Sequence, residues 1–436
     1  MKRVLLCIVI LVLAAASLSA EGKQEESAAT VKDMEGEVEL WHYWMAGGEV
    51  EALNALRDAF QEDYPGVKLV DRGIPGGSAE MRRQIGTALM GGNPPETFMV
   101  ALGYRLKSFA DADRLIPITD VWDEINGDKI FPQGLVNVIR IDGEAWSVPI
   151  NIHTVNHMWY NKKMFDKYGL KEPKTWEEFG ELCDVLKDNG ITPLTGSGQS
   201  WALYQFYPFV LDAVGPEGYV QLGEGQLSWT DPRLRGAFEK YKKYSLGNII
   251  EGWAGYGWAE AASAFVNGKV AMYNTVGDWT AAFYESQGME PGVDFDFFPA
   301  PGTTDIVIGQ VDSFALLNGC DRPDLGKLFL KFVASEKAQV AFNTYKGSVA
   351  ANLNTPSDFY NSVMLKTYKR MKDPNTTFLP NFYFLCPPEF QETYDEEYDR
   401  YAIDPTPAVL DSVIQNLENL RKEIESEGKW VDWEWK

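Results

Sequence analysis

The sequence predicts an α/β fold built on largely parallel β-sheets. Segments with strand composition alternate with amphipathic helical segments through most of the 436 residues, and this alternation is typical of strand–helix–strand units. The length exceeds that of one ordinary domain and suits two. Hydrophobic residues make up 45% of the chain, which is enough for a sizeable core.

The first third of the chain shows the alternation most clearly. Strands are expected at residues 38–44, 67–70 and 97–100, because these runs are rich in β-branched and aromatic residues. Helices are expected at 50–63 and 78–90, where apolar residues recur every three or four positions. Three strands separated by two helices predict a parallel sheet.

The rest of the chain continues this pattern. Residues 147–160 are rich in Val, Ile, Trp and Tyr and are expected to be extended. Thr175 and Glu178 form a capping box that starts a helix, and Asp231–Pro232 is a typical start of another. A long amphipathic helix is expected near the end, over residues 409–424.

The N-terminus has the pattern of a cleavable signal peptide. Lys2 and Arg3 precede an apolar run of about 13 residues, which is too short to span a bilayer, and small residues up to Ala20 follow it. No cysteine follows the run directly, so we expect free secretion into a periplasm rather than a lipid anchor. The expected signal peptide covers residues 1–20, and a polar, disordered leader covers 21–35.

The charge balance argues against two classes of partner. The chain contains 40 Lys and Arg and 63 Asp and Glu, which gives a formal net charge of −23. Such an acidic protein would be repelled by nucleic acids and by anionic membranes. We therefore expect neither as a partner.

The few cysteines and histidines predict neither a disulfide framework nor a metal site. Cys183, Cys320 and Cys386 remain after the signal and allow at most one disulfide; Cys183 lies on an apolar helix face and is expected to be a buried thiol. His153 and His157 are four residues apart, but in an extended segment this spacing spans about 13 Å, too far for one ion. No metal and no cofactor are expected.

Sequence signatures of enzymes are missing. The chain has no G-x-S-x-G, H-E-x-x-H or G-x-x-x-x-G-K-[ST] motif. A glycosidase would need two carboxylates across the scissile bond, and Asp278 and Asp312 are the only pair that suggests itself, without a supporting motif. The acidic run Asp395–Glu397 is more typical of a solvated face. We therefore expect a protein that is not an enzyme.

The surplus of tryptophan points to a carbohydrate cleft. Several of the 14 Trp residues lie beside polar residues in glycine-containing segments: His42–Trp44, Ser200–Gln205, Gly257–Glu260 and Gly277–Trp279. One face of a sugar ring presents C–H groups that pack on aromatic rings, and its hydroxyls need polar partners. Structural alternatives stay open: Trp201 and Trp258 as core rings, and Asp278 as a helix cap. Asp312, in a strand-like run, is unusual unless it faces a cleft, whereas Trp176 is expected to be structural.

The order of motifs resembles the extracellular sugar-binding proteins of ABC importers, the maltose-binding-protein superfamily (family 1), and most closely its glucose-binding branch. The matching stretches are Tyr64–Val67, Gly91–Glu96, Asp142–Pro149, Trp159–Lys162, Lys174–Phe179, Gly268–Met272, Gly277–Trp279 and Lys346–Ser348. The resemblance implies the type II periplasmic-binding-protein fold, with two lobes, each a mainly parallel sheet flanked by helices, and hinge strands between them. The implied segments are 36–150 and 309–352 for the N-lobe, 151–308 and 353–436 for the C-lobe, with crossings at Asn151–Val155 and Ile308–Asp312.

The resemblance also implies a ligand, a partner and a set of contacts. A monomer would bind a mono- or short oligosaccharide between the lobes and deliver it to the permease of an ABC transporter. The implied ring contacts are Tyr43, Trp44, Trp201, Trp258 and Trp279, and the implied hydroxyl partners are Gln205, Asp278, Asp312 and Lys346. One departure is that Met99 and Ala101 stand where the glucose-binding branch has polar residues, which leaves open a different sugar or a different binding position.

Two rival functions stay open. A secreted carbohydrate-active hydrolase would use the same aromatic rings. A binder of a non-sugar solute, such as a polyol phosphate or a peptide, would call for arginines in the cleft. Arg82, Arg83 and Arg105 are the candidates, although they fit helix faces better.

Overall fold

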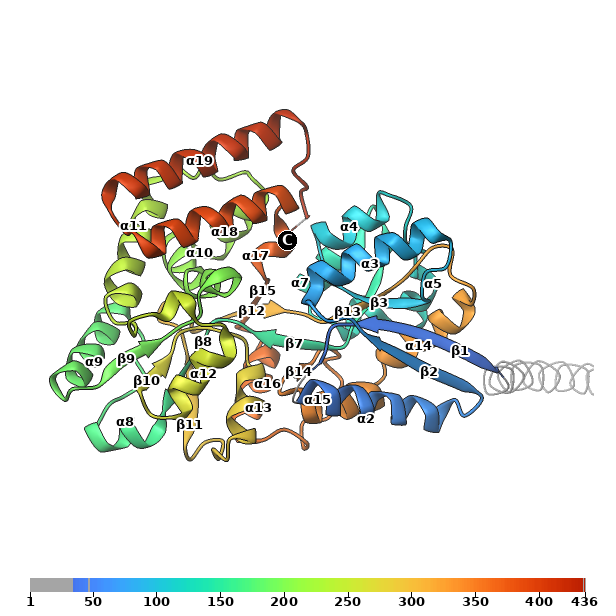
Figure 1. Ribbon diagram of the computed structural model, residues 1–436, viewed down its shortest axis with the longest axis horizontal. Helices are drawn as coiled ribbons and strands as arrows, with labels where there is room; N and C mark the ends of the chain where they lie inside the picture. The colour runs from blue at the N-terminus through green and yellow to red at the C-terminus, as the bar shows by residue number, and fades with distance from the viewer. Residues whose placement is uncertain (1–33, 46–47, 434, 436) are drawn as a thin grey trace, which may run out of the picture.

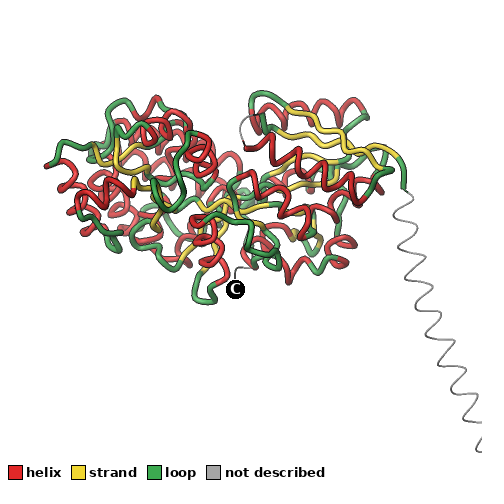
Figure 2. The backbone as a smooth tube through the Cα atoms, turned by 90° about the horizontal axis from the view of Figure 1, so that it is seen from below, coloured by secondary structure: helices red, strands yellow, loops and turns green. Residues whose placement is uncertain are grey.

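The computed structural model describes residues 34–45, 48–433 and 435 (Figure 1). The expected signal peptide, residues 1–20, and most of the expected leader lie outside these residues. Within the described ranges no helix combines the length and the apolar character needed to cross a bilayer. Two bodies, each a sheet flanked by helices, lie side by side and are joined by strands in the middle (Figures 1 and 2).

The first lobe is built on a five-stranded sheet. Its strand order is β2 (Val67–Gly73), β1 (Gly36–His42), β3 (Thr97–Val100), β13 (Ser313–Leu316) and β6 (Ser147–Pro149). β1 runs parallel to β2 and to β3, as the alternation predicts, whereas β13 is antiparallel to both of its neighbours. β13 runs antiparallel because the chain returns to the lobe through β13 at the same end of the sheet where it leaves through β6, with Pro149 opposite Ser313.

The second lobe differs from the expected mainly parallel sheet. Its strand order is β11 (Phe295–Pro299), β8 (His157–Asn161), β10 (Val270–Tyr273) and β9 (Thr192–Thr195). Only β10 and β9 are parallel, whereas β8 is antiparallel to both β10 and β11. β8 enters the lobe where β11 leaves it, with His157 opposite Pro299, so this sheet is mixed for the same reason.

A third sheet lies between the lobes. Its strands are β14 (Val349–Ala350), β7 (Asn151–Thr154), β12 (Ile306–Gln310) and β15 (Thr377–Pro380). β7 and β12 are antiparallel, with Gly309 opposite Thr154 and Gln310 opposite His153. Both segments that the resemblance assigns to lobe crossings therefore lie in one sheet, at the junction of the two bodies (Figure 1).

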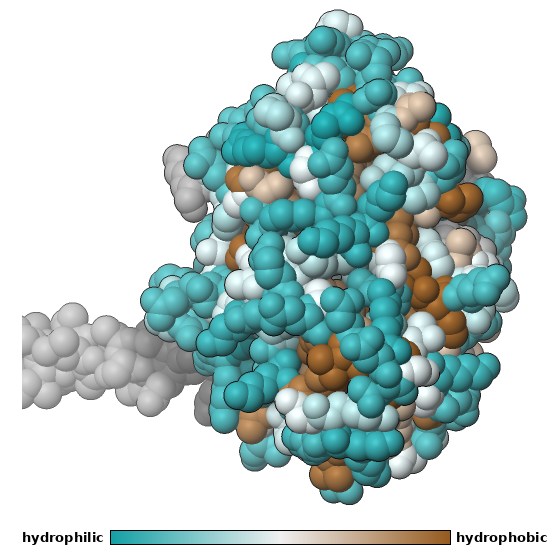
Figure 3. Space-filling model, turned by 90° about the vertical axis from the view of Figure 1, so that its left-hand side faces the viewer, coloured by the Kyte–Doolittle hydropathy of each residue, from teal (hydrophilic) through white to brown (hydrophobic). Residues whose placement is uncertain are grey.

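The helices cover the outer faces of the lobes. Those of the first lobe are α2 (Gly48–Asp63), α3 (Gly77–Gly91), α4 (Tyr104–Ala110), α5 (Thr119–Glu124), α6 (Gly127–Ile130), α7 (Gln133–Ile139), α14 (Pro323–Val333) and α15 (Glu336–Lys346), with a hairpin of β4 (Arg140–Ile141) and β5 (Glu144–Ala145). Those of the second are α8 (Lys162–Tyr168), α9 (Trp176–Asp188), α10 (Tyr207–Gly223), α11 (Pro232–Tyr241), α12 (Trp258–Val266), α13 (Trp279–Ser286), α16 (Ser362–Lys372), α17 (Phe382–Leu385), α18 (Pro388–Ile403) and α19 (Pro407–Ser426). The outer end of the second lobe is predominantly hydrophilic, with hydrophobic residues in small groups (Figure 3).

Several local predictions are confirmed. Thr175 caps α9 by accepting a hydrogen bond from the Glu178 amide, and Asp231 caps α11 through the Arg233 amide. Trp176 is a core residue, with its ring stacked on Phe209 at 3.9 Å between centroids. The three described cysteines are free, and Cys183 is buried as expected.

The expected extended character of residues 147–160 is confirmed, but the segment forms three strands rather than one. Ile150 and the pair Val155–Asn156 divide it into β6, β7 and β8, and each strand belongs to a different sheet. The Asn156 side chain stabilises the second break, because its Nδ2 donates to the Ile306 carbonyl at 2.9 Å and its Oδ1 accepts from the Ile308 amide at 3.1 Å. Composition predicts that these residues are extended, but not that the chain crosses between lobes here.

Candidate functional site

An aromatic chamber lies between the two lobes. It has a volume of about 420 Å³, within the range of small-molecule sites. The sequence-predicted residues that line it are Tyr43, Trp44, Trp201, Trp258, Trp279, Asp312 and Lys346. The structure therefore brings together residues that lie up to 303 positions apart in the chain, from Tyr43 to Lys346.

The first lobe contributes a wall of the chamber from the residues that come directly after β1. Tyr43 and Trp44 lie just beyond the strand, and the Trp44 amide donates to Nδ1 of His42 at 3.1 Å. The Trp44 ring is only 2% exposed and packs against Phe314 and Phe342, with centroids 5.8 and 4.9 Å away. Only an edge of this indole is therefore available to a ligand.

The wall from the second lobe consists of three half-buried tryptophans. Trp201 lies in the 3₁₀ helix Gln199–Gln205, and Trp258 and Trp279 are the first residues of α12 and α13. Trp201 and Trp279 lie 5.6 Å apart between centroids. The Trp279 ring folds over Gly277, where an added Cβ would lie 1.6 Å from the ring, so only glycine fits at that position.

The floor of the chamber is a polar network on the crossing strand β7. Nδ1 of His153 lies 2.6 Å from Oδ1 of Asp278, and its Nε2 lies 3.5 Å from Oδ2 of Asp312. Asn151 donates from Nδ2 to Oδ2 of Asp312 at 2.9 Å. Nζ of Lys346 lies 2.6 Å from Oε1 of Glu49 and 3.8 Å from Oδ2 of Asp312.

The charges of this network favour an ionised Asp312. Burial opposes its ionisation, but Lys346 and the hydrogen bond from His153 outweigh burial and lower the pKa of Asp312 to about 2. Burial would also lower the pKa of His153, yet its hydrogen bonds to Asp278 and Asp312 raise that pKa above the ordinary value. The floor thus presents an anionic hydrogen-bond acceptor, as a sugar hydroxyl requires.

Two expected ligand contacts, Asp278 and Gln205, do not line the chamber. Asp278 is fully buried, and its two oxygens are engaged by His153 Nδ1 and by the Thr154 amide at 3.0 Å. Its side chain does not cap α13 either, so the helix-cap alternative is wrong. Gln205 is also buried and donates from Nε2 to the Ser197 carbonyl at 2.7 Å.

The same geometry argues against Asp278 and Asp312 as the two catalytic carboxylates of a glycosidase. The imidazole of His153 lies between Asp278 and Asp312, with one ring nitrogen toward each. In a glycosidase the scissile bond would lie between the two carboxylates, but here that position is occupied by the imidazole.

Other lining residues were missed by sequence reasoning. These are Glu49, Gly77, Ser78, His153, Tyr204, Gln310 and Tyr383. The sequence does not predict a ligand contact at His153, and no group of metal-binding side chains occurs among the described residues. The signal that could have found His153 is its place in the crossing strand beside Asn151, since hinge strands form the floor of an interlobe cavity.

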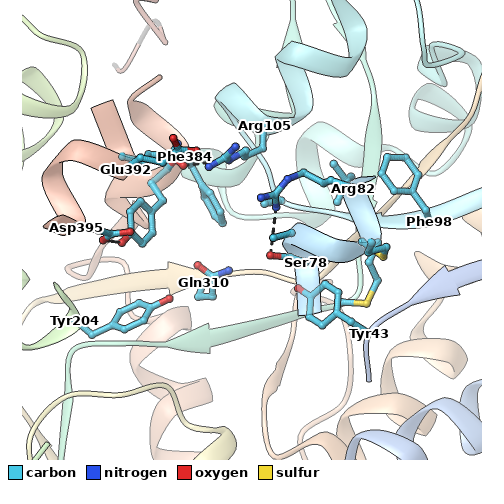
Figure 4. Close-up of a pocket in the computed structure, with 17 residues that line it drawn as sticks. Tyr43, Ser78, Arg82, Phe98, Arg105, Tyr204, Gln310, Phe384, Glu392 and Asp395 are labelled. Carbon is cyan, nitrogen blue, oxygen red and sulfur yellow. Dashed lines mark hydrogen bonds between the residues drawn. The ribbon is translucent and has the colours of Figure 1, made fainter. Parts of the chain in front are cut away.

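A second cavity adjoins the first and extends the cleft. It measures about 410 Å³ and shares Tyr43, Tyr204 and Gln310, among others, with the aromatic chamber. We call it the arginine chamber, because Arg82 and Arg105 point into it from the first lobe (Figure 4). The expectation that Arg82 and Arg105 lie on helix faces away from the cleft is therefore wrong, although it holds for Arg83, which is exposed and pairs with Glu80.

The chain has two α/β lobes, two crossing strands and a cavity between the lobes. These features define the class of two-lobed binding proteins. The family model of bacterial extracellular solute-binding proteins matches residues 46–340, which is more than half of the chain. The chain belongs to this family.

Individual relatives agree with this assignment. An uncharacterized ABC transporter extracellular-binding protein of Pyrococcus horikoshii is 32% identical over 367 residues, covering 83% of this chain and 82% of that protein. A probable sugar-binding periplasmic protein of Rhizobium meliloti is 29% identical over 353 residues, covering 80% of this chain and 84% of that protein. The bacterial solute receptor AcbH, described as having an exclusive preference for β-D-galactopyranose, matches in structure with a TM-score of 0.73 and 22% identity, covering 90% of this chain and 100% of that one. At that identity the likeness supports the fold alone.

Proposed function

We propose that this protein captures a carbohydrate between its lobes, closes on it and delivers it to the permease of an ABC transporter outside the cytoplasm, in a periplasm. The observation that carries the proposal is the aromatic chamber, in which rings from both lobes surround an anionic acceptor and an ammonium group. Rings contribute stacking surface for the C–H face of a sugar, and Asp312 and Lys346 suit its hydroxyls.

The ligand contacts that we propose are Tyr43, Trp44, Trp201, Trp258, Trp279, Asp312 and Lys346. Because these side chains come from both lobes, a bound sugar stabilises the closed form over the open one. The closed form is the one that we expect the permease to recognise, and the protein is expected to act as a monomer.

A glycosidase is less well supported. Asp278 is buried behind His153, and Glu49, the other carboxylate among the described lining residues, is paired with Lys346 at 2.6 Å. The names of the relatives are those of binding proteins, which agrees with capture rather than cleavage.

A thermal-shift screen with neutral mono- and disaccharides, followed by calorimetry of the hits, tests the proposal. A ligand at 100 times its dissociation constant stabilises the folded state by about 2.7 kcal/mol. Binding of a saccharide without its cleavage supports the proposal. Cleavage of a disaccharide would contradict it, and so would the absence of any shift across neutral and acidic sugars alike.

A further inference from the structure

The arginine chamber contains two guanidinium groups without a carboxylate partner. Arg82 lies on α3 and Arg105 on α4, and both point into the cavity (Figure 4). Their hydrogen bonds go to neutral groups: Arg82 Nη1 donates to Ser78 Oγ at 3.3 Å, and Arg105 Nε donates to Gln391 Oε1 at 3.1 Å. Within the described part of the chain neither arginine forms an ion pair, although acidic residues outnumber basic ones by 63 to 40.

The positive charges of Arg82 and Arg105 repel each other in this cavity. Burial and the nearby charge of Arg105 lower the pKa of Arg82. A guanidinium is planar and presents several N–H donors in a fork that matches carboxylates and phosphates. An anion between the two arginines would therefore gain charge-assisted hydrogen bonds from both and relieve their repulsion.

The acidic side chains of the opposite wall, Glu392 and Asp395, offset this charge only in part. Asp395, on α18, accepts a hydrogen bond from the Tyr383 hydroxyl, and burial raises the pKa of Asp395 to about 7. Asp395 therefore carries less negative charge near pH 7 than an ordinary aspartate does. Glu392 is exposed at the edge of the cavity, where solvent screens its charge.

The wall formed by β3 and the residue after it offers no hydrogen-bonding side chains. Met99 and Ala101, the departures from the glucose-binding branch noted in the sequence, line this chamber. Neutral polar side chains, among them Tyr43, Ser78 and Gln310, lie elsewhere around the cavity. What distinguishes this chamber is its two guanidinium groups without an ion-pair partner among the described residues, and these favour an anionic substituent.

We propose that the arginine chamber binds the negatively charged group of an acidic saccharide, a uronate carboxylate or a sugar phosphate, while a ring of the same ligand lies in the aromatic chamber. This inference rests on the proposed function and specifies its ligand class. The two cavities share lining residues, so one ligand is able to occupy both.

Calorimetry with matched pairs of ligands tests the inference on the full mature chain. The pairs are galactose with galacturonic acid, glucose with glucuronic acid, and digalactose with digalacturonic acid; galactose phosphate serves as the phosphate probe. For at least one pair we expect the acidic member to bind about 10- to 100-fold more tightly at low salt, with a preference that falls as salt increases. Tighter binding of galactose phosphate than of the uronates would identify the anion as a phosphate.

Variants separate the arginines from the rest of the cleft. The double variant Arg82→Gln/Arg105→Gln should lose the preference for the acidic member and keep its affinity for neutral sugars within about 3-fold. Arg83→Gln, one residue away on α3 and outside the cavity, should behave as wild type. Urea unfolding of each variant verifies that the fold is intact.

Three results would overturn the inference. Neutral and acidic members that bind equally would leave the proposed function intact and remove the charge preference. An equal loss of both affinities in the double variant would assign the arginines to a contact between the lobes. Absence of binding to every saccharide, neutral or acidic, would overturn the proposed function and the inference together.

Discussion

Replacing Asp312 with asparagine should destabilise the empty protein and weaken sugar binding. The substitution keeps the size of the side chain but removes its negative charge, which faces Lys346 at 3.8 Å and His153 at 3.5 Å. Asp312 is 8% exposed, so solvent screens these interactions only weakly.

The magnitude follows from the pKa of Asp312. That pKa is about 2 in the folded protein, compared with about 3.9 in an unfolded chain, and one unit corresponds to about 1.4 kcal/mol. The ionised carboxylate therefore contributes on the order of 2 kcal/mol to the free energy of unfolding at neutral pH. Because the folded-state pKa is depressed, this stability is present above about pH 4 and is lost as the pH falls toward 2.

Urea unfolding of wild type and Asp312→Asn between pH 7 and pH 3 measures this effect. We expect the variant to be less stable by about 2 kcal/mol at pH 7, with a difference that shrinks below pH 4. Asp296→Asn is the control, because Asp296 pairs with Lys366 at 3.3 Å outside the cleft and such partly exposed pairs contribute about 0–1 kcal/mol. A variant as stable as wild type at pH 7, or a difference that stays constant down to pH 3, would refute the reasoning.

Three further predictions concern residues that line the aromatic chamber or lie behind it. Trp279→Ala should weaken sugar binding by about 30- to 150-fold in calorimetry, because a stacking ring is removed; unchanged affinity would exclude Trp279 from the site. Gln205→Ala should leave the affinity within about 3-fold but lower the free energy of unfolding by about 1–3 kcal/mol, since the Ser197 carbonyl loses its donor; a large loss of affinity would place Gln205 in contact with the ligand. Lys346→Met should raise the pKa of Asp312, because the ammonium that lowers it is removed. In unfolding experiments the acid-dependent loss of stability should then be smaller and be complete at a higher pH than in wild type; an unchanged pH dependence would contradict this.

Local structure was predictable where one segment decides it alone. The strand at 97–100 and the caps at Thr175 and Asp231 follow from composition and short-range hydrogen bonding, and the structure has them at those positions. The clustering of tryptophans beside polar residues pointed to residues that line the aromatic chamber, because such rings rarely lie beside glycine and acid in a core.

Properties that depend on distant partners could not be read from the sequence. The division of 147–160 into strands of three sheets depends on β12 and β13, which come more than 140 residues later. The exclusion of Asp278 from the chamber depends on His153, 125 positions away. Likewise, Arg82 and Arg105 have ordinary helical surroundings in the sequence. The packing of α17 against α4 and the hydrogen bond from Arg105 to Gln391 on α18 enclose them in a cavity.

A crystal structure of the protein with its highest-affinity saccharide tests the central claim most directly. We predict a sugar ring in the aromatic chamber, in contact with Trp44 of one lobe and Trp258 and Trp279 of the other, with a hydroxyl within hydrogen-bonding distance of Asp312. A saccharide bound outside this chamber, or one that touches residues of a single lobe, would contradict the account.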